Sequence, residues 1–402
     1  MVSEAVTIKD PPTDDGVNTT IDLTGSLQNI YDLSTVTIYA NVVRATHGES
    51  VPEEVLGNGD GSQTYQSFTL RQSPLTYTSA STPSGAASTL SVRVNDIEWH
   101  EVPSLYGSGP RDRVFVTTSD DSGKVTVEFG DGRTGARLPT GQQNVRATYR
   151  KGVGLAGLAK AGQLSLLMTR PLGVKSVINP QAASGTADPE SVADARNNAS
   201  LTILTLDRIV SLQDYEDFAR AFIGIAKALA TSIRVGQLRG VFVTVAGPNG
   251  ADIQQDSDLY TNLVAAMKNA GDPYIPLIVE SYNQAFFKIA AKVKLDPDFD
   301  QKVVLSAAEQ ALRSTYSFDA RSFGQPVMLS EVIAVMQAVP GVIAVDVYKF
   351  YRADTTASSI GLPPAQLTAA SPQADSSTST TVSAAELLIL YPGPLDDLGI
   401  MP

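Results

Sequence analysis

The alternation of apolar and polar residues changes along the chain and predicts regions of different structure. Over residues 124–129 the two kinds of side chain alternate strictly, which predicts a strand buried on one face. Other short runs rich in Val, Ile, Thr and Tyr, bounded by clusters of Gly, Asp, Asn and Ser, predict further strands. These runs are residues 36–39, 90–94 and 113–117. We therefore predict a β-rich domain over residues 39–150, preceded by an arm or linker at residues 1–38.

Helix signals begin near residue 185. Asp188-Pro189-Glu190 combines a capping residue, a proline suited to the first helical position and an acid in the first turn. Ser211 is followed three residues later by Asp214, an arrangement similar to a capping box. One apolar helix face follows, made of Tyr215, Phe218, Ala219 and Phe222. The second half of the chain is therefore predicted to combine helices with strands.

Two small α+β modules are predicted in this second half. The first covers residues 196–284 and is joined to the β-rich domain by a connecting segment, residues 151–195. Its expected elements are strands at residues 232–235, 241–245 and 276–281 and a helix at residues 257–269. The second module covers residues 285–352. Its expected elements are strands at residues 287–295 and 342–350 and helices at residues 301–316 and 329–338.

The last region, residues 353–402, is predicted to be a linker rich in Ser, Thr and Pro that ends in a strand. Residues 353–384 have too few apolar side chains to form a core, so we expect them to be flexible. Residues 386–392 are apolar and need a sheet edge, on their own chain or on a neighbour. The predicted fold class is therefore α+β multidomain, with an N-terminal β-rich domain, two small α+β modules and a flexible tail ending in a strand.

Charge narrows the classes of partner. The chain of 402 residues carries a formal net charge of −12, which argues against binding a nucleic-acid backbone. Its best basic patch is the row Lys288, Lys292 and Lys294, which is expected to be a solvated face or to meet an acidic protein. The sequence has no run of about 18 apolar residues and no recognisable signal peptide, so direct membrane insertion is not expected.

Candidate metal and nucleophile chemistry is restricted by the residues that the chain lacks. There is no cysteine, which excludes disulfides, thiolate nucleophiles and cysteine-bound zinc. The two histidines, His47 and His100, do not form the pair one helical turn apart that a zinc peptidase needs. Tyr106-Gly107-Ser108-Gly109 lacks the glycine spacing of a serine nucleophile elbow.

Three further patterns match binding or catalytic sequences only in part. Residues 152–157 have the spacing G-x-G-x-x-G, but the acid that a dinucleotide site needs roughly 20 residues later is missing. We interpret these glycines as flexible or closely packed backbone. Asn58, Asp60 and Ser62 have the spacing of calcium ligands, but Thr69 stands where a closing acid is needed.

The third pattern is Glu98 beside Trp99, which a glycan hydrolase could use, although a single tryptophan in a β-rich domain is more typical of a core anchor. None of these patterns is complete. We therefore predict no catalytic residue, no cofactor-binding residue, no metal ligand and no cofactor.

Six segments, in a consistent order between residues 39 and 228, resemble the baseplate J-like family, specifically the baseplate assembly proteins of phage-tail-like contractile injection systems. The most specific are FGDGRTGARLPTG at residues 129–141 and TLDRIVSLQDYEDFA at residues 205–219. The other segments are residues 45–57, 73–77, 92–99 and 179–196. One departure is Gly157-Leu158, where relatives tend to carry Gly-Asn.

This resemblance implies a structural wedge subunit rather than an enzyme. Such subunits form a ring around the central spike of the particle, and the ring is thought to rearrange on triggering and release contraction of the sheath. The implied partners are other baseplate wedge subunits, including copies or paralogues of this chain, central spike or hub proteins, and sheath or sheath-initiator proteins. Assembly is expected in the cytoplasm. A tail-associated glycan hydrolase or a carbohydrate-binding tail module stays open as the alternative.

Overall fold

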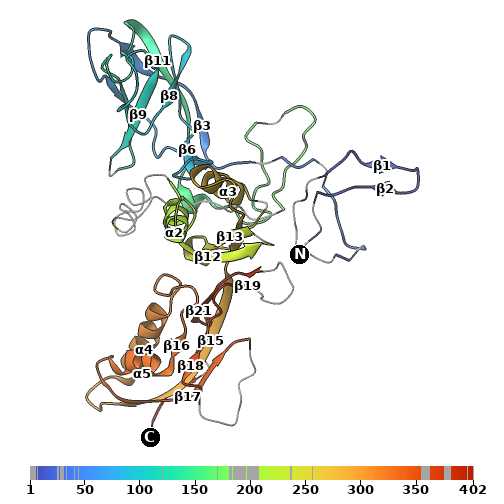
Figure 1. Ribbon diagram of the computed structural model, residues 1–402, viewed down its shortest axis with the longest axis vertical. Helices are drawn as coiled ribbons and strands as arrows, with labels where there is room; N and C mark the ends of the chain where they lie inside the picture. The colour runs from blue at the N-terminus through green and yellow to red at the C-terminus, as the bar shows by residue number, and fades with distance from the viewer. Residues whose placement is uncertain are drawn as a thin grey trace. The chain divides into compact units, whose positions relative to one another are not determined.

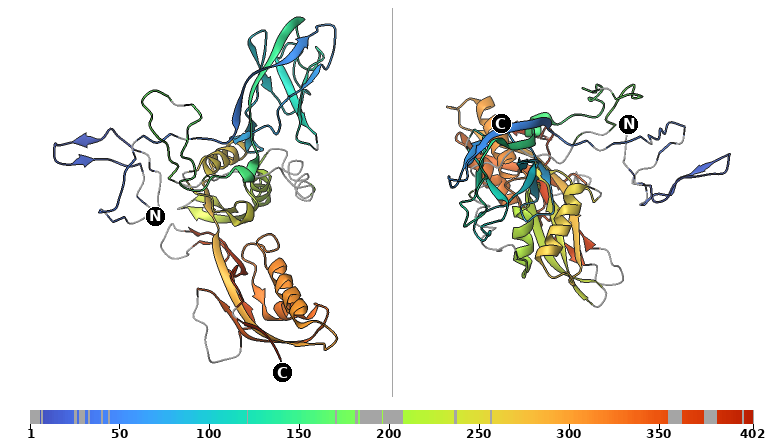
Figure 2. Two further views of the ribbon diagram at one scale, coloured as in Figure 1. Left: turned by 180° about the vertical axis from the view of Figure 1, so that it is seen from behind. Right: turned by 90° about the horizontal axis from the view of Figure 1, so that it is seen from above.

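The chain divides into two compact units, residues 1–77 with 88–189 and residues 78–87 with 190–402 (Figures 1 and 2). The computed structural model describes residues 6, 8–24, 27, 31–32, 34–39, 41–43, 45–120, 122–169, 171–180, 183, 196, 208–235, 238–255, 257–354, 363–374, 382–395 and 397–401. Helices and strands both contribute, which confirms the α+β class. Among these described residues the four α-helices all belong to the second unit.

The described part of the N-terminal arm contains one small hairpin. Strands β1 (Thr13–Asp14) and β2 (Thr19–Thr20) pair antiparallel. The Oδ1 atom of Asp15 accepts hydrogen bonds from the backbone N–H groups between them, and Gly16 supplies the left-handed conformation with φ of +83°. The strand predicted at residues 36–39 is wrong, because these residues are exposed and form no strand. β-branched residues favour a strand only where a neighbouring strand and a core are available.

The first unit is built on a seven-stranded sheet. In order across the sheet, its strands are β3 (Glu49–Gly59), β11 (Gly141–Lys151), β7 (Ser91–Val94), β8 (Ile97–Glu101), β9 (Val114–Ser119), β10 (Val125–Phe129) and β4 (Ser67–Thr69). Neighbours are antiparallel except β8 and β9. The outermost strands β3 and β4 meet where the Phe68 ring lies against Gly57, so the sheet curls around one core.

The core of this sheet confirms two predictions. In β10 the side chains alternate between buried and half-buried, as its sequence predicted. Trp99 is buried and its ring centroid lies 5.3 Å from that of Phe129 in an edge-to-face contact. Trp99 is therefore a core anchor, and β7 and β9 confirm the strands predicted near residues 90–94 and 113–117.

The second unit includes residues 78–87 and a central module. Strands β5 (Tyr77–Ser79) and β6 (Ala86–Ser88) form a hairpin whose Gly85 lies against the Phe222 ring. A Cβ atom at Gly85 would be 2.7 Å from that ring. This close approach requires glycine.

The central module packs two helices on a three-stranded sheet. Across the sheet the order is β12 (Lys227–Val235), β13 (Leu238–Ala246) and β14 (Leu277–Ser281), and helices α2 (Leu212–Ala221) and α3 (Asp258–Ala270) cover the face that carries Val243, Val245 and Val279. The capping box predicted at the start of α2 is confirmed. The Ser211 Oγ accepts from Asp214 N–H at 3.1 Å, and Asp214 Oδ2 accepts from Ser211 N–H at 2.8 Å. Residues between β13 and α3 form the short helix η2 (Pro248–Gly250).

The C-terminal module has a sheet of four strands. Its strands are β17 (Val342–Arg352), β15 (Asn283–Leu295) and β21 (Glu386–Leu390), with β22 (Asp397–Ile400) also paired to β15. Its helices are α4 (Gln301–Thr315) and α5 (Leu329–Gln337), close to the predicted helices. Strand β15 includes the strand predicted at residues 287–295, and its Phe287, Ile289 and Val293 are buried.

The described part of the tail differs from the expected linker. Strand β18 (Gln366–Leu367) pairs with β16 (Val327–Met328), and Leu367 is buried in the core of the C-terminal module. Strand β19 (Gln373–Ala374) pairs with β20 (Val382–Ser383). A few apolar residues are therefore enough to fix this segment, because partners for pairing are nearby. The helix start predicted at residues 188–190 lies outside the described residues.

Candidate functional site

The joint between the central and C-terminal modules is the place where distant segments of the second unit converge. Strand β14 ends at Ser281 in the central sheet and β15 begins at Asn283 in the C-terminal sheet, so only Tyr282 separates the two sheets. A polypeptide that crossed here alone would be free to bend. A second connection is made by residues 382–390, which we call the strap.

The strap contacts both modules. Its first part packs Val382 and Ala384 against Ile233, Phe242 and Ile278 of the central sheet. This is the face opposite to α2 and α3, because Phe242 alternates with the valines that the helices cover. Its second part, β21, pairs in parallel with β15. The strap therefore spans the point at which the chain passes from one sheet to the other.

Hydrogen bonds hold the strap at the crossing. The backbone N–H of Ala385 donates to the Thr244 hydroxyl at 3.1 Å, and Thr244 is fully buried. Asn283 donates from its backbone N–H to Ala385 O at 2.9 Å and from its side chain to Ala384 O at 3.0 Å. Buried polar groups of this kind destabilise the fold when one partner is lost, so they fix a single arrangement of the joint.

Aromatic side chains fill the other side of the joint. Tyr282 is buried with Ala246 and Leu387, its ring lies 5.9 Å from that of Phe323, and its hydroxyl donates to Gly250 O at 2.9 Å. Lys227 lies with its ammonium 5.2 Å from the centroid of the Phe318 ring. Burial is the main reason that the pKa of Lys227 is lowered. Side chains of the two modules therefore pack against one another, in addition to the covalent connection of the chain.

An ion cluster lies where β17, the tail and β21 meet. Arg352 donates to both carboxylate oxygens of Glu386, at 2.8 and 2.9 Å, and also bonds Asp354 and Thr368 O. Glu386 accepts in addition from Ala370 N–H at 2.8 Å. Because Arg352 donates to it, the pKa of Glu386 is lowered, and the pKa of Arg352 is raised mainly by the same bonds. The cluster anchors the start of β21.

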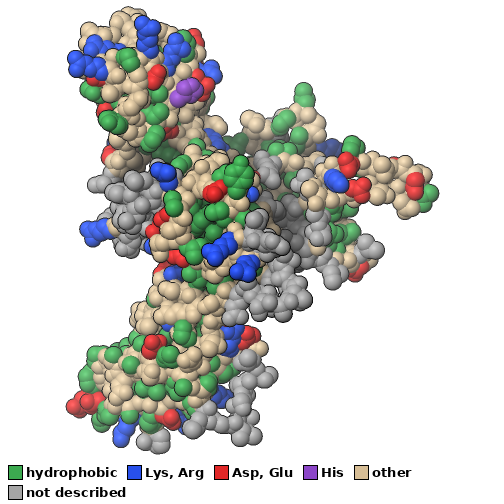
Figure 3. Space-filling view, viewed as in Figure 1, with side chains coloured by type: hydrophobic (Ala, Val, Ile, Leu, Met, Phe, Trp, Pro, Cys, Tyr) green, Lys and Arg blue, Asp and Glu red, His purple; other side chains and the backbone are tan. Residues whose placement is uncertain are grey.

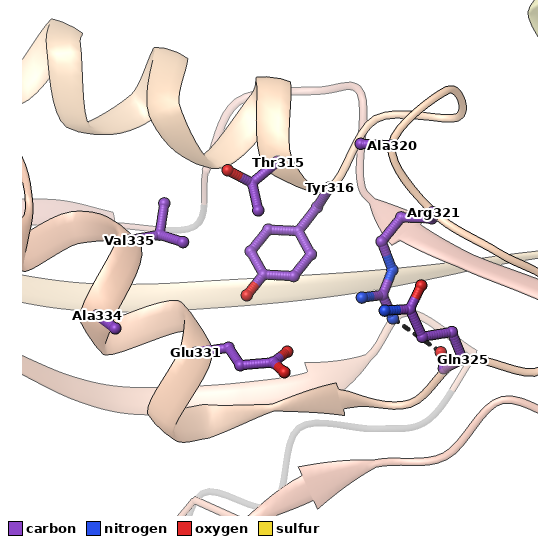
Figure 4. Close-up of a pocket in the computed structure, with 8 residues that line it drawn as sticks. All are labelled: Thr315, Tyr316, Ala320, Arg321, Gln325, Glu331, Ala334 and Val335. Carbon is purple, nitrogen blue, oxygen red and sulfur yellow. Dashed lines mark hydrogen bonds between the residues drawn. The ribbon is translucent and has the colours of Figure 1, made fainter. Parts of the chain in front are cut away.

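A cavity of about 350 Å³ lies beside α4 and α5 in the C-terminal module (Figure 4). Arg321 is buried there, with its guanidinium 5.5 Å from the Tyr316 ring centroid, and its Nη2 donates to Gln325 O and Pro326 O. Tyr316 Oη and Arg321 Nε have no hydrogen-bond partner among the described residues. Burial, and then the nearby Glu331 carboxylate, raises the pKa of Tyr316 to about 12. Because the Tyr316 phenol stays neutral beside Arg321 and Glu331, the cavity can bind a small polar group.

The comparisons with known proteins bear on the central module. Residues 207–280 match the family model described as "Baseplate J-like central domain". This part of the chain is therefore similar to the central domain of baseplate J-like proteins. The match confirms the predicted resemblance over these residues, which contain α2, α3, β12, β13 and all of β14 except Ser281.

A solved structure is also similar to the chain. It is titled "Cryo-EM structure of the anti-feeding prophage (AFP) baseplate, 6-fold symmetrised", is 12% identical over 86% of this chain and 74% of the other, and has a TM-score of 0.37. A similarity of this size does not establish a shared overall fold. No curated protein matches the sequence.

The FGDGRTG motif outside the baseplate J-like central domain forms a self-contained turn. Asp131 Oδ1 accepts from Thr134 N–H at 2.7 Å and Arg133 N–H at 2.8 Å, which lowers its pKa to about 2. Gly130 is needed because a Cβ atom there would lie 2.4 Å from the backbone of Gly135. These bonds close the turn and give Asp131 and Gly130 a structural role.

The glycines of residues 152–157 also have a packing role, as one of the two interpretations proposed. A Cβ atom at Gly152 or Gly157 would lie 2.4 or 2.3 Å from the imidazole of His47. The His47 Nε2 accepts from Val153 N–H at 3.0 Å. This contact fixes the chain just before β3 and just after β11. The pattern therefore reflects close packing against His47.

The remaining sequence candidates do not converge. Glu98 and His100 are exposed on β8, and the Asp60 carboxylate binds Ser62 and Gln63 within a turn. Within the described residues no group of three or more His, Cys, Asp or Glu is placed to hold a metal ion. Likewise, no helix of the described residues is both long and apolar enough to cross a membrane.

Sequence reasoning missed the joint and the Arg352–Glu386 cluster. These two residues are 34 positions apart and carry no motif. The one available signal was the apolar run of β21, which predicted a pairing but not the partner strand. Of the lysine row, Lys288 is half-buried with its ammonium 4.5 Å from the centroid of the Tyr391 ring, whereas Lys292 and Lys294 are exposed.

Proposed function

We propose that the protein is a structural wedge subunit of the baseplate of a phage tail or contractile injection system. The observation that carries this proposal is the match of residues 207–280 to the baseplate J-like central domain. The subunit would form part of a ring around the central spike and couple triggering to contraction of the sheath. Its partners would be other wedge subunits, including copies or paralogues, together with spike or hub proteins and sheath or sheath-initiator proteins.

The strapped joint supports a mechanical role. A subunit that passes a displacement from one neighbour to another must not bend between the two surfaces that it presents. The strap and the Tyr282 cluster connect the central and C-terminal modules at two places, and the Arg352–Glu386 pair anchors the strap within the C-terminal module. Tightly packed elements of this kind move as a whole rather than deforming gradually. We propose no catalytic step and no cofactor.

Imaging assembled particles from the producing cell tests the proposal. Density for the central and C-terminal modules in the ring around the spike is the expected result. Deleting the gene should leave tubes or sheaths without a complete baseplate, and expression of the full chain should restore it. Particles that assemble and contract normally without this chain would contradict the proposed role.

A further inference from the structure

The segment between residues 159 and 183 has described apolar side chains that are exposed. Its base is closed by Asn179, which accepts from Gly162 N–H at 2.7 Å and from Leu164 N–H at 2.8 Å and donates to Lys160 O at 2.8 Å. Ala183 N–H donates to Ala159 O at 2.8 Å. The segment is therefore a closed loop with a defined base. We call it the apolar loop.

The exposure of this loop is unusual in extent. Leu166 is 68% exposed, Met168 97% and Leu172 fully exposed. Leu164, Val174 and Ile178 are exposed as well, and no described residue from 159 to 180 is buried. A contiguous set of large apolar side chains in water is costly and marks an interaction surface.

Charge identifies the kind of surface that would receive the loop. Residues 132–187 contain eight Lys or Arg and no Asp or Glu, a formal charge of +8. Since the whole chain carries −12, the remaining residues carry −20. Within the loop, Lys160 and Lys175 are exposed beside the apolar residues. The complementary surface is therefore apolar with a rim of carboxylates.

A corner of the C-terminal module has this composition. Phe299, Val303 and Ile343 are 44%, 66% and 49% exposed. Asp296 and Gly341 join the segments that carry them, because Asp296 N–H donates to Gly341 O at 2.9 Å and Gly341 lies against the Phe299 ring. The segment that carries Phe299 also contains three carboxylates within five residues, Asp296, Asp298 and Asp300. Figure 3 shows hydrophobic and acidic side chains together on the surface of the C-terminal module. We call it the acidic corner.

We propose that the apolar loop of one copy of this chain docks on the acidic corner of a second copy. Such a contact joins two different surfaces, so repetition gives a head-to-tail series that closes into a ring when the rotation allows it. The contact itself rests on the loop and the corner alone. Only its place in a ring around the spike rests on the proposed function.

Crosslinking can test the contact because the chain has no cysteine of its own. Purified Met168→Cys protein is mixed with Val303→Cys protein and treated with a bis-maleimide crosslinker. The control partner is Tyr274→Cys, an equally accessible position at 88% exposure in the central module. We expect the Val303 pair to give about fivefold more mixed dimer, since a docked contact raises the local concentration of its partner groups. Equal yields with both partners would overturn the proposal.

A charge exchange tests the choice of the acidic corner. Lys175→Glu in the Met168→Cys protein should lower the yield, and Asp298→Lys in the Val303→Cys protein should restore it. Asp300 is avoided because it caps α4. Failure of Asp298→Lys to restore the yield would also contradict the proposal. Binding of the wild-type chain to phosphatidylserine vesicles, lost in a Met168→Ser, Leu172→Ser variant and without preferential crosslinking, would assign the loop to a lipid surface instead.

These outcomes are distinct from failure of the proposed function. A chain that is absent from baseplates could still show preferential crosslinking, and a chain located in the baseplate could fail to show it.

Discussion

Breaking the Arg352–Glu386 pair is expected to lower the free energy of unfolding of the second unit by more than the loss of an exposed surface ion pair would. The two side chains are 19% and 20% exposed and make two N–O contacts. At this depth and separation a Coulomb energy of about 4–6 kcal/mol is an upper limit for an effective dielectric constant of about 20. Desolvation and the competing bonds of Arg352 reduce this. We expect a coupling energy of about 1.5–3 kcal/mol, in the range of charge-assisted hydrogen bonds.

A double-mutant cycle measures that coupling. The variants are Arg352→Met, Glu386→Gln and the two combined, unfolded in urea and followed by circular dichroism at 222 nm. This signal reports the second unit, because the α-helices of the described residues all belong to it. The control cycle uses Arg146 and Glu53, which are 40% and 56% exposed with one contact at 3.1 Å, followed by Trp99 fluorescence in the first unit. For that exposed pair about 0.2–1 kcal/mol is expected.

The pH dependence gives a second reading of the same pair. Because the folded state lowers the pKa of Glu386, its carboxylate holds fewer protons when folded than when unfolded. Its stabilising contribution is therefore complete above the ordinary pKa of about 4.3 and declines as the pH falls through the lowered pKa. The difference between wild type and Glu386→Gln should shrink below about pH 4. A coupling below about 0.5 kcal/mol, or equal to that of the control cycle, would refute the view that this pair anchors the strap.

Three further substitutions test the packing. Leu388→Ala, in the fully buried part of β21, should lower the free energy of unfolding of the second unit by about 2–5 kcal/mol. The control Leu172→Ala, in the exposed apolar loop, should change the free energy of unfolding by less than about 0.5 kcal/mol. Similar losses in the two variants would contradict the burial of β21. Gly130→Ala should cost about 1–3 kcal/mol in urea unfolding of the first unit, because its Cβ would lie 2.4 Å from Gly135, and an unchanged midpoint would exclude this clash. Tyr149→Phe removes a 2.6 Å hydrogen bond to the buried Glu54. It should lower the free energy of unfolding of the first unit by about 1–3 kcal/mol, measured by Trp99 fluorescence. An unchanged free energy would indicate that Glu54 is turned outward to solvent.

The features that could be predicted from sequence depend on close neighbours. The capping box at Ser211 needs only four successive residues, and the alternation in β10 identifies a face that any core would bury. The interpretation of Trp99 as a core anchor needed no knowledge of its partners. The predicted domain boundaries stay predictions, since the two units group the chain differently and residues 78–87 join the second unit.

The features that could not be predicted depend on contacts between distant residues. Residues 36–39 have the composition of a strand but meet no partner strand in the described structure. Leu367 lies in a stretch with the composition of a linker, yet its side chain is buried in a core formed with residues of α5 and β15. The sequence shows Thr244 only as one residue of a buried strand. Its role as hydrogen-bond acceptor for Ala385 is visible only in the folded structure. Composition indicates the structure that a segment favours by itself, whereas the structure of these residues depends on contacts with residues distant in the sequence.

The order of synthesis gives the strap a further consequence. Residues 382–390 leave the ribosome after the central module and after β15, α4, α5 and β17, so the central module can fold while the C-terminal sheet still lacks β21 and the strap is not yet in place. Closing the joint requires contacts over long sequence separation, between Thr244 and Ala385 and between Asn283 and Ala384. A nascent chain therefore stays hinged until synthesis has passed residue 390. Only a chain that includes the strap is rigid at the joint. An assembly that incorporates rigid subunits would therefore exclude chains truncated before residue 390 without a separate quality-control factor.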